Sequence, residues 1–252
     1  MKNNFELEYK QLLTNCLLEN KLCGNRTNVK TYKLFNKSIN IDLADGFPII
    51  TGKKIDFDKG LHEFLWIYNG KTDLKYLNEN NIKWWDDFAI NGKLGKVYGY
   101  QVRKYNGNFD QIDYCINEIK NNSRRAIITL WNPSDLDEQA LPCCYTQFNF
   151  VRINDELNMA MDFRSSDLFL GLPYDIIVGA LFLIAIAKEC GLKPKMLGIN
   201  LKDAHIYENH YNQVEKYLNL PIYNLPKIKI NKGEYEIENY NCGPFIKAEL
   251  VK

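Results

Sequence analysis

The stretch RSSDLFLGLPYDIIVGALFLIAIAKECG, residues 164–191, joins a polar turn to a long apolar run and decides the fold. From residue 173 to residue 191 the side chains are almost all apolar, which predicts a buried helix because a surface helix carries a polar face. Gly191 and Pro194 mark the end of this helix, since glycine favours the C-cap conformation and proline cannot continue a helix. The first four residues, RSSD, offer a guanidinium, two hydroxyls and a carboxylate, a set that suits the binding of an anion.

Helices and strands are mixed along the rest of the chain. Helical spacing of apolar residues predicts helices over residues 5–20, 58–69 and 109–121, and the first has Leu7, Leu12, Leu13, Leu17 and Leu18 on or near one face. Short apolar or alternating runs predict strands over residues 31–43, 126–131, 144–153, 157–164, 223–230 and 235–237. This combination favours an α+β fold, with a sheet covered by helices. Neither a flexible linker nor an internal repeat interrupts the chain, so residues 1–252 are predicted to form one domain.

Composition limits the class of protein. Of the 252 residues, 46% are hydrophobic and 25% are charged, and the net charge is +1, which argues against a disordered tail and a broad nucleic-acid-binding surface. The seven cysteines include no C-x-x-C pair, so we expect free thiols in a reducing compartment, without a metal site. The first ten residues are too polar for a secretory signal, and the longest apolar run, residues 176–187, is too short to cross a membrane.

Cys144 is the candidate nucleophile. It stands in LPCCY, residues 141–145, directly before a predicted strand. The thiolate is the reactive form of cysteine, and nearby positive charge favours it. Arg26, Arg124, Arg125 and Arg164 could supply that charge or bind an anion. Each assignment has an ordinary alternative, because a cysteine beside a strand is usually a small core residue and the pair 124–125 could end a helix in solvent.

A polar stripe follows one predicted strand near the C-terminal end. Asp203, His205 and Tyr207 alternate along the sequence, so their side chains would share one face of a strand. That face could be turned either to a ligand or to solvent. His210, three residues further on, is expected to be simply exposed.

Glu63 lies within an apolar helix face, with His62 beside it. Burial of a carboxylate without a partner is costly, so Glu63 is expected to be either paired or catalytic. Trp84 and Trp85 are interpreted as core or wall residues, and stacking on a flat ring ligand is the functional alternative.

Seven segments, taken in order, resemble the thymidylate synthase family. They are NRT (25–27), DGFP (45–48), HEFLW (62–66), VYG (97–99), SRR (123–125), RSSDLFLGLP (164–173) and DAHIYENH (203–210). The resemblance implies one domain with a mixed β-sheet that forms a homodimer interface. It also implies an enzyme that transfers one carbon from 5,10-methylenetetrahydrofolate to C5 of a pyrimidine deoxynucleotide, without a metal and without stable binding to nucleic acid or membrane.

The resemblance implies a role for each matching residue. Cys144 would attack C6 of the base, which makes C5 nucleophilic, while Glu63 and Tyr98 would move protons through ordered water. Arg124 and Arg125 would reach the phosphate site of the partner subunit. The resemblance also implies contacts to the phosphate (Arg26, Arg164, Ser165), to the sugar hydroxyl (His205, Tyr207) and to the folate (Trp85, Asp167, Gly171, Tyr174). Asp167 would also lie near the nucleotide, and Leu250 belongs to the C-terminal tail that would close over the folate.

Asp175 departs from the family pattern, because the thymidylate-forming members carry asparagine there. Asparagine both donates and accepts, as uracil requires, whereas an ionised aspartate only accepts and suits the amino group of cytosine. Tyr145, where the synthases have histidine, indicates a rebuilt base pocket, and Asp56, where histidine is also expected, affects the folate contacts. The same aspartate occurs in bacteriophage deoxycytidylate hydroxymethylases, so the favoured substrate is dCMP.

The product depends on how the one-carbon unit is released. In the family, water leads to a hydroxymethyl group and hydride from the folate leads to a methyl group, according to how dry the closed site is. We expect dCMP 5-hydroxymethyltransferase activity in the cytoplasm, or in the host cytoplasm if a virus encodes the protein. The alternatives are a dCMP 5-methylase, an ordinary thymidylate synthase acting on dUMP, and a catalytically silent dimer that binds nucleotide or RNA.

Overall fold

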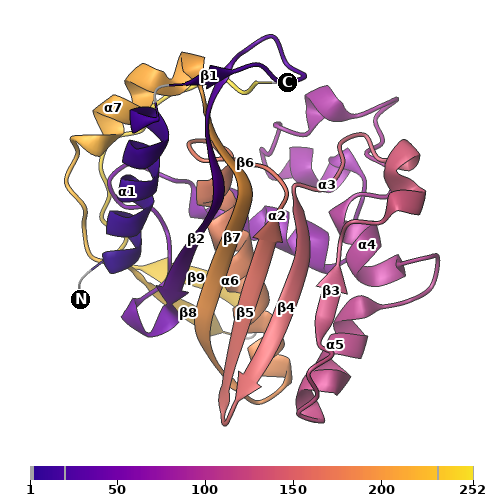
Figure 1. Ribbon diagram of the computed structural model, residues 1–252. Helices are drawn as coiled ribbons and strands as arrows, with labels where there is room; N and C mark the ends of the chain where they lie inside the picture. The colour runs from indigo at the N-terminus through magenta and orange to yellow at the C-terminus, as the bar shows by residue number, and fades with distance from the viewer. Residues whose placement is uncertain (1–2, 20, 232, 252) are drawn as a thin grey trace.

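The computed structural model describes residues 3–19, 21–231 and 233–251 (Figure 1). Two sequence predictions extend past these ranges, since Asn20 at the end of the first predicted helix and Lys252 at the end of the tail lie outside the described residues. The fold combines one large mixed sheet with helices, and it confirms the predicted α+β class.

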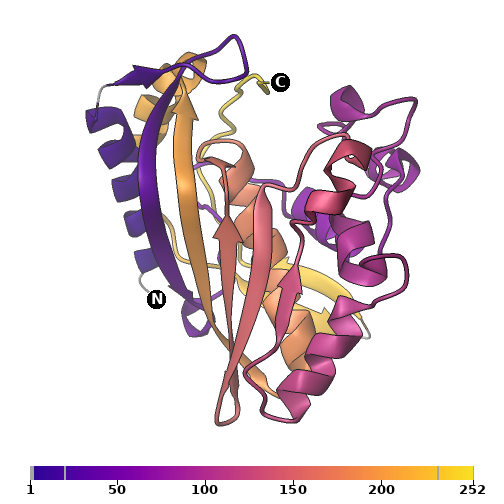
Figure 2. The same ribbon diagram turned by 45° about the vertical axis from the view of Figure 1, so that its right-hand side comes forward.

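Seven strands of the described chain form the main sheet, in the order β1-β2-β7-β5-β4-β3, with β6 paired to β7. Neighbours are antiparallel except where β7 runs parallel to β5 and β6. Helices α2 (Phe57–Tyr68) and α6 (Gly171–Glu189) lie behind this sheet in Figure 1, and the turned view in Figure 2 separates them from the strands. The strands are β1 (Leu22–Cys23), β2 (Thr31–Asp42), β3 (Ile127–Thr129), β4 (Tyr145–Ile153), β5 (Glu156–Phe163), β6 (Ser166–Asp167) and β7 (Lys193–Tyr207).

Helices cover the sheet and its edges, and a small hairpin of β8 (Lys227–Asn231) and β9 (Glu234–Glu238) lies beside them. The hairpin confirms strands near residues 223–230 and 235–237, although the first begins four residues later than predicted. The α-helices are α1 (Asn4–Leu18), α2 (Phe57–Tyr68), α3 (Leu74–Glu79), α4 (Tyr98–Lys104), α5 (Gln111–Lys120), α6 (Gly171–Glu189) and α7 (Tyr211–Leu218). Single 3₁₀ turns are η1 (Leu43–Asp45), η2 (Asp86–Phe88), η3 (Pro133–Glu138) and η4 (Glu208–His210).

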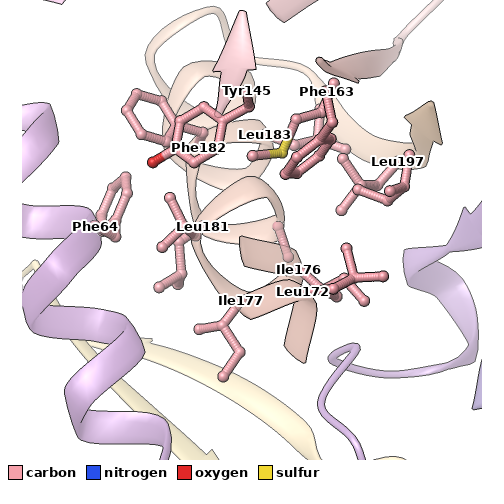
Figure 3. Packing of buried hydrophobic residues seen from close by; sticks show 14 of the residues in the cluster. Phe64, Tyr145, Phe163, Leu172, Ile176, Ile177, Leu181, Phe182, Leu183 and Leu197 are labelled. Atoms are coloured by element: carbon pink, nitrogen blue, oxygen red, sulfur yellow. The ribbon is translucent and has the colours of Figure 1, made fainter. Parts of the chain in front are cut away.

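Helix α6 forms the centre of the core, as its apolar sequence predicts (Figure 3). The ring of Phe182 lies between Phe64 of α2 and Phe148 of β4, with ring centres 5.1 and 5.0 Å away. Among the described helices, α6 is the one with the length and apolar composition of a membrane span, but most of it is buried inside the protein, as in the core of a globular domain.

The buried face of α1 differs from the sequence prediction. Leu12 and Leu13 are buried, but Leu7 and Leu18 are 58% and 74% exposed. The reason is geometric, because eleven residues make slightly more than three whole helical turns and place Leu7 and Leu18 on the same outer face. The inner face also includes a carboxylate that the apolar pattern did not indicate, that of Glu6.

Glu6 ties α1 to the segment between η1 and α2. Its carboxylate accepts hydrogen bonds from the backbone N–H groups of Thr51 and Gly52 at 2.8 and 2.7 Å. It also accepts from the side chains of Asn3, Thr51 and Tyr217, at 2.7, 2.6 and 2.7 Å. Because the carboxylate is fully buried, these donors replace the water that it would otherwise bind.

Replacing Glu6 by Ala is expected to lower the free energy of unfolding by at least ~3 kcal/mol, since several buried donors lose their acceptor. Urea unfolding followed by circular dichroism measures the change. Glu8→Ala, at an exposed position of the same helix, is the matched control. Equal stability of the two variants would contradict the anchoring role of Glu6.

Candidate active site

Cys144 lies directly before β4 and is half-buried, whereas its neighbour Cys143 is fully buried. The backbone N–H of Cys144 donates to the hydroxyl of Tyr98, at 2.7 Å. Arg164, directly after β5, donates to the carbonyl oxygens of Cys143 and Pro142, at 2.9 and 2.7 Å. The same guanidinium lies 3.9 Å from the Cys144 sulfur. Two distant segments therefore hold the cysteine loop and bring positive charge to the thiol.

Opposing influences act on the Cys144 thiol. Burial is the largest and raises its pKa, because a thiolate is poorly stabilised away from water. The positive charges of Arg164 and Arg26 and a hydrogen bond with Tyr98 lower that pKa, whereas the carboxyl of Asp175 raises it. The charges of three predicted site residues, Arg164, Arg26 and Asp175, therefore act on the Cys144 thiol, and the two arginines are the ones that favour its reactive thiolate form.

Glu63 has hydrogen-bond partners, in agreement with the expectation that this buried carboxylate is either paired or catalytic. One carboxylate oxygen, Oε1, accepts from the indole N–H of Trp85 at 2.8 Å and of Trp84 at 3.2 Å. Burial raises the pKa of Glu63, and the two indole hydrogen bonds lower it. This glutamate is therefore a candidate proton carrier, because its environment holds both protonation states within reach.

Asp175 is the fifth residue of α6 and lies within the electrostatic influence of this carboxyl. Burial, followed by the charges of Glu63 and Asp167, raises its pKa well above the usual range. Tyr145 packs against Tyr98 with ring centres 4.3 Å apart, and burial raises the pKa of both phenols far above 10. The two tyrosines are therefore neutral hydroxyls that can donate and accept hydrogen bonds.

Asp167 shapes the entry into α6. Its Oδ1 accepts from the backbone N–H groups of Phe169 and Leu170, at 2.9 and 3.2 Å, which leaves Oδ2 available for a ligand donor. Trp84 and Tyr174, the latter also near the start of α6, pair with ring centres 5.0 Å apart. Flat aromatic faces suit a flat ring such as that of a folate.

The predicted stripe on β7 is partly a hydrogen-bonded network. Nδ1 of His205 donates to Asp203 at 3.0 Å, and Lys33 of β2 pairs with the same carboxylate at 2.8 Å. These contacts, first that with His205 and then that with Lys33, lower the pKa of Asp203 to about 2 despite partial burial. Because Nδ1 carries the hydrogen, Nε2 of a neutral His205 is an acceptor, and the Tyr207 ring lies 5.1 Å away.

His210 is buried, so the expectation that it is exposed was wrong. Its Nε2 donates to the backbone carbonyl of Glu249 at 2.7 Å, which holds the C-terminal tail beside η4. The next tail residue, Leu250, is partly exposed. Figures 1 and 2 both show the tail ending beside the β1–β2 loop, which carries Arg26. The tail therefore lies at the same end of the sheet as a predicted phosphate ligand.

Other predicted residues are not gathered around Cys144 within one chain. Arg124 and Arg125 are exposed between α5 and β3, as the solvent alternative also expected. Ser165 and Gly171 are half-buried beside Arg164 and Asp167 in the chain. Asp56 is exposed and caps α2, since its carboxylate accepts from the backbone N–H of Lys59 at 3.4 Å.

Lys53 is a residue of this region that sequence reasoning missed. Its ammonium group donates to the carbonyl of Phe169 at 2.6 Å and lies 3.6 Å from the centre of that ring. Burial lowers its pKa to about 7, against the opposing charges of Asp167 and Glu6. Nothing in the local sequence TGKK distinguishes it from its exposed neighbour Lys54, because only the packing decides which lysine is enclosed.

Replacing Arg164 by Gln is expected to raise the pKa of Cys144 and to slow its alkylation near neutral pH by up to ~10-fold, since one pKa unit is a tenfold change in thiolate. The measurement is the rate of iodoacetamide labelling at Cys144 as a function of pH, followed by peptide mass spectrometry. Arg152→Gln, on the far part of β4, is the control. An unchanged labelling midpoint in the Arg164 variant would rule out this arginine as the source of activation.

The sequence was also compared with protein families. A family model described as Thymidylate synthase matches residues 7–251, which is nearly the whole chain. Its members are one-carbon transferases that act on C5 of a pyrimidine nucleotide with methylenetetrahydrofolate as co-substrate, and they are typically homodimers. No group of three or more His, Cys, Asp or Glu side chains suited to a metal occurs within the described residues. The match over almost every residue, together with the fold, shows that this chain belongs to the thymidylate synthase family.

Proposed function

We propose that this protein is a dCMP 5-hydroxymethyltransferase, which converts dCMP, 5,10-methylenetetrahydrofolate and water to 5-hydroxymethyl-dCMP and tetrahydrofolate. The observation that carries the proposal is the position of Asp175, a carboxyl near the start of the buried helix α6, whose pKa is raised by burial and by the charge of Glu63 and which adds to the effect of burial in raising the pKa of Cys144. The family assignment supports the reaction class, and Asp175 supports the choice of base.

The hydrogen-bonding pattern of the base edge explains the choice. Cytosine offers an amino donor at N4 and an acceptor at N3, whereas uracil offers an acceptor at O4 and a donor at N3. The raised pKa of Asp175 lets one proton be shared between its carboxyl and N3 of cytosine, while the other carboxyl oxygen accepts from N4. An ionised carboxyl still accepts from N4 but would face O4 of uracil without a hydrogen, so the ionised form is the one that discriminates against uracil. A mismatched buried polar pair costs roughly 1–3 kcal/mol, which corresponds to a ~10- to 100-fold preference.

The residues around Cys144 have distinct proposed tasks. The thiolate attacks C6 of the base, which places electron density on C5, and Arg164 and Arg26 stabilise the thiolate before attack. Glu63 and Tyr98 move protons at the ring, and Tyr145 lines the base pocket where its neutral hydroxyl can bond a polar ring atom. The phosphate contacts are assigned to Arg26, Arg164 and Ser165, and the sugar hydroxyl to His205 and Tyr207.

The folate would be held by Trp85, Asp167, Gly171 and Tyr174, with Leu250 of the tail above it. When bound, it supplies a one-carbon unit at the oxidation level of formaldehyde. The free oxygen of Asp167 can accept from a ring N–H, and the Trp84–Tyr174 pair offers a stacking surface. Glu63 is a buried carboxyl that can orient a water molecule near the base. The hydroxymethyl product is proposed over the methyl product because an aspartate like Asp175 accompanies that reaction in the family.

A homodimer completes the proposed site. Arg124 and Arg125 are exposed, so they are free to enter the phosphate site of the partner subunit. The sheet carries exposed apolar side chains at Phe35, Val151 and Ile153, which supports sheet-to-sheet association. All seven cysteines are free thiols, which fits a cytoplasmic enzyme, or one in the host cytoplasm if a virus encodes it. One domain, residues 1–252, is proposed to bind nucleotide and folate without a stable nucleic-acid or membrane partner.

Mass analysis of the product from dCMP and methylenetetrahydrofolate tests the proposal. The expected result is an added hydroxymethyl group and no dihydrofolate. An added methyl group with dihydrofolate would identify a dCMP methylase, and turnover of dUMP alone would identify a thymidylate synthase. Full activity in cells with Cys144→Ser would instead support the silent binding dimer.

Replacing Asp175 by Asn is expected to shift the preference from dCMP toward dUMP by ~10-fold or more, because the amide donates to O4 and accepts from N3–H of uracil. Tritium release from C5-labelled dCMP and dUMP measures the ratio of kcat/KM. Asp162→Asn, on β5 and away from α6, is the control. The same ratio in the Asp175 variant and the wild type would remove the basis for cytosine recognition.

A further inference from the structure

Two consecutive tryptophans converge on one oxygen atom. Trp84 and Trp85 lie in the turn directly before η2, and both indole N–H groups donate to Oε1 of Glu63, at 3.2 and 2.8 Å. Two donors use both lone pairs of that oxygen. Within the described residues no hydrogen bond reaches the other oxygen, Oε2, although the whole residue is only 8% exposed. Hydrogen bonds to Oε1 therefore fix the carboxylate, and Oε2 is left able to bond a ligand or water.

The two indoles are fixed by different parts of the protein. Trp84 pairs with Tyr174 of α6 and lies 5.9 Å below the ammonium group of Lys59. Trp85 packs against Tyr98 of α4, with ring centres 5.9 Å apart. Because each ring packs against a separate neighbour, neither indole can turn away from Glu63 without losing its contact with Tyr174 or Tyr98.

Asp175 is the carboxyl that competes with Glu63 for a proton. Burial and the charge of Glu63 raise the pKa of Asp175 and Tyr174 on α6 and of Tyr145 on β4, and Lys59 lies one helical turn away on α2 itself. The two tyrosines are neutral, so the relevant pair is Glu63 and Asp175. Two nearby buried carboxyls do not both ionise readily, and the one with more hydrogen-bond donors keeps the negative charge.

The donors are distributed unequally between the pair. Glu63 receives two indole hydrogen bonds, whereas no hydrogen bond to the Asp175 carboxyl occurs among the described residues. We infer that Trp84 is a positioning residue that, together with Trp85, keeps Glu63 ionised and thereby leaves the proton of the carboxyl pair on Asp175. In the proposed function, on which this role rests, Asp175 then donates to N3 of cytosine while Oε2 of Glu63 accepts a proton or orients water.

The direct test is titration of the free protein, labelled with ¹³C at the carboxyl carbons of Asp and Glu, with Glu63→Gln and Asp175→Asn assigning the signals by NMR. In the wild type, Glu63 is expected to ionise at lower pH than Asp175. Trp84→Phe keeps the ring and removes the donor, so the Glu63 midpoint is expected to move up and the Asp175 midpoint to move down. Trp85→Phe should move both midpoints in the same directions, which provides a second variant if the first is unstable.

Trp66→Phe is the matched control, because Trp66 also loses a buried indole hydrogen bond, to the carbonyl of Asp73 at 3.0 Å, but does not bond Glu63. It is expected to lower stability and to leave both midpoints in place. Unchanged midpoints in both Trp84→Phe and Trp85→Phe, or a wild type in which Asp175 ionises first, would overturn the inference.

Turnover separates this role from the proposed function. Trp84→Phe is expected to lower kcat for dCMP by ~10-fold with a smaller change in KM, since a hydrogen bond to a charged group is lost at the reacting centre. Shifted midpoints in a protein that does not act on dCMP would support the carboxyl pair and contradict the proposed function. Normal turnover of dCMP with unshifted midpoints would support the proposed function and contradict the role of the tryptophans in the carboxyl pair.

Discussion

Burial of helix α6 is the constraint on which the site depends. The helix is enclosed by α2 and by β4, β5 and β7 of the sheet, and its apolar side chains interdigitate with theirs (Figure 3). Close-packed interiors move little, so Tyr174 and Asp175 at the start of the helix are fixed relative to the sheet. Asp167 caps the turn that leads into α6, and Arg164 precedes that turn. The packing of α6 thus fixes the positions of several candidate site residues at and before its N-terminal end.

The same burial gives the site its electrostatic character. Removal from water raises the pKa of Glu63 and, more strongly, that of Asp175, and it keeps the phenols of Tyr98 and Tyr145 neutral. The protein compensates selectively, with two indole donors on Glu63 and a guanidinium beside Cys144. The pKa values of groups of the same chemical type are therefore shifted to different extents, as for Glu63 and Asp175.

Sequence reasoning succeeded where local pattern is strong. The α6 helix, the β4–β5 pair and the position of Cys144 before a strand follow from apolar runs and turn residues, and the requirement that Glu63 be paired follows from the cost of its burial. It did not predict the length of β7, because Lys, Pro and Gly within KPKMLGINLKDAHIY hide the strand pattern. It also missed α3, α4 and α7, since helices this short are stabilised by tertiary packing rather than by their own sequence.

The sequence by itself determined the family and the chemical identity of the candidate site residues, including the carboxyl at position 175, because these are properties of residue type and order. The tertiary structure alone decided which groups meet. Arg164 reaches Cys144 across 20 residues, Trp85 reaches Glu63 across 22, and Tyr98 meets Cys144 across 46. It also decided that Lys53 and His210 are enclosed while Leu7 and Leu18 face solvent. Such contacts depend on how whole elements pack, and no local spacing encodes them.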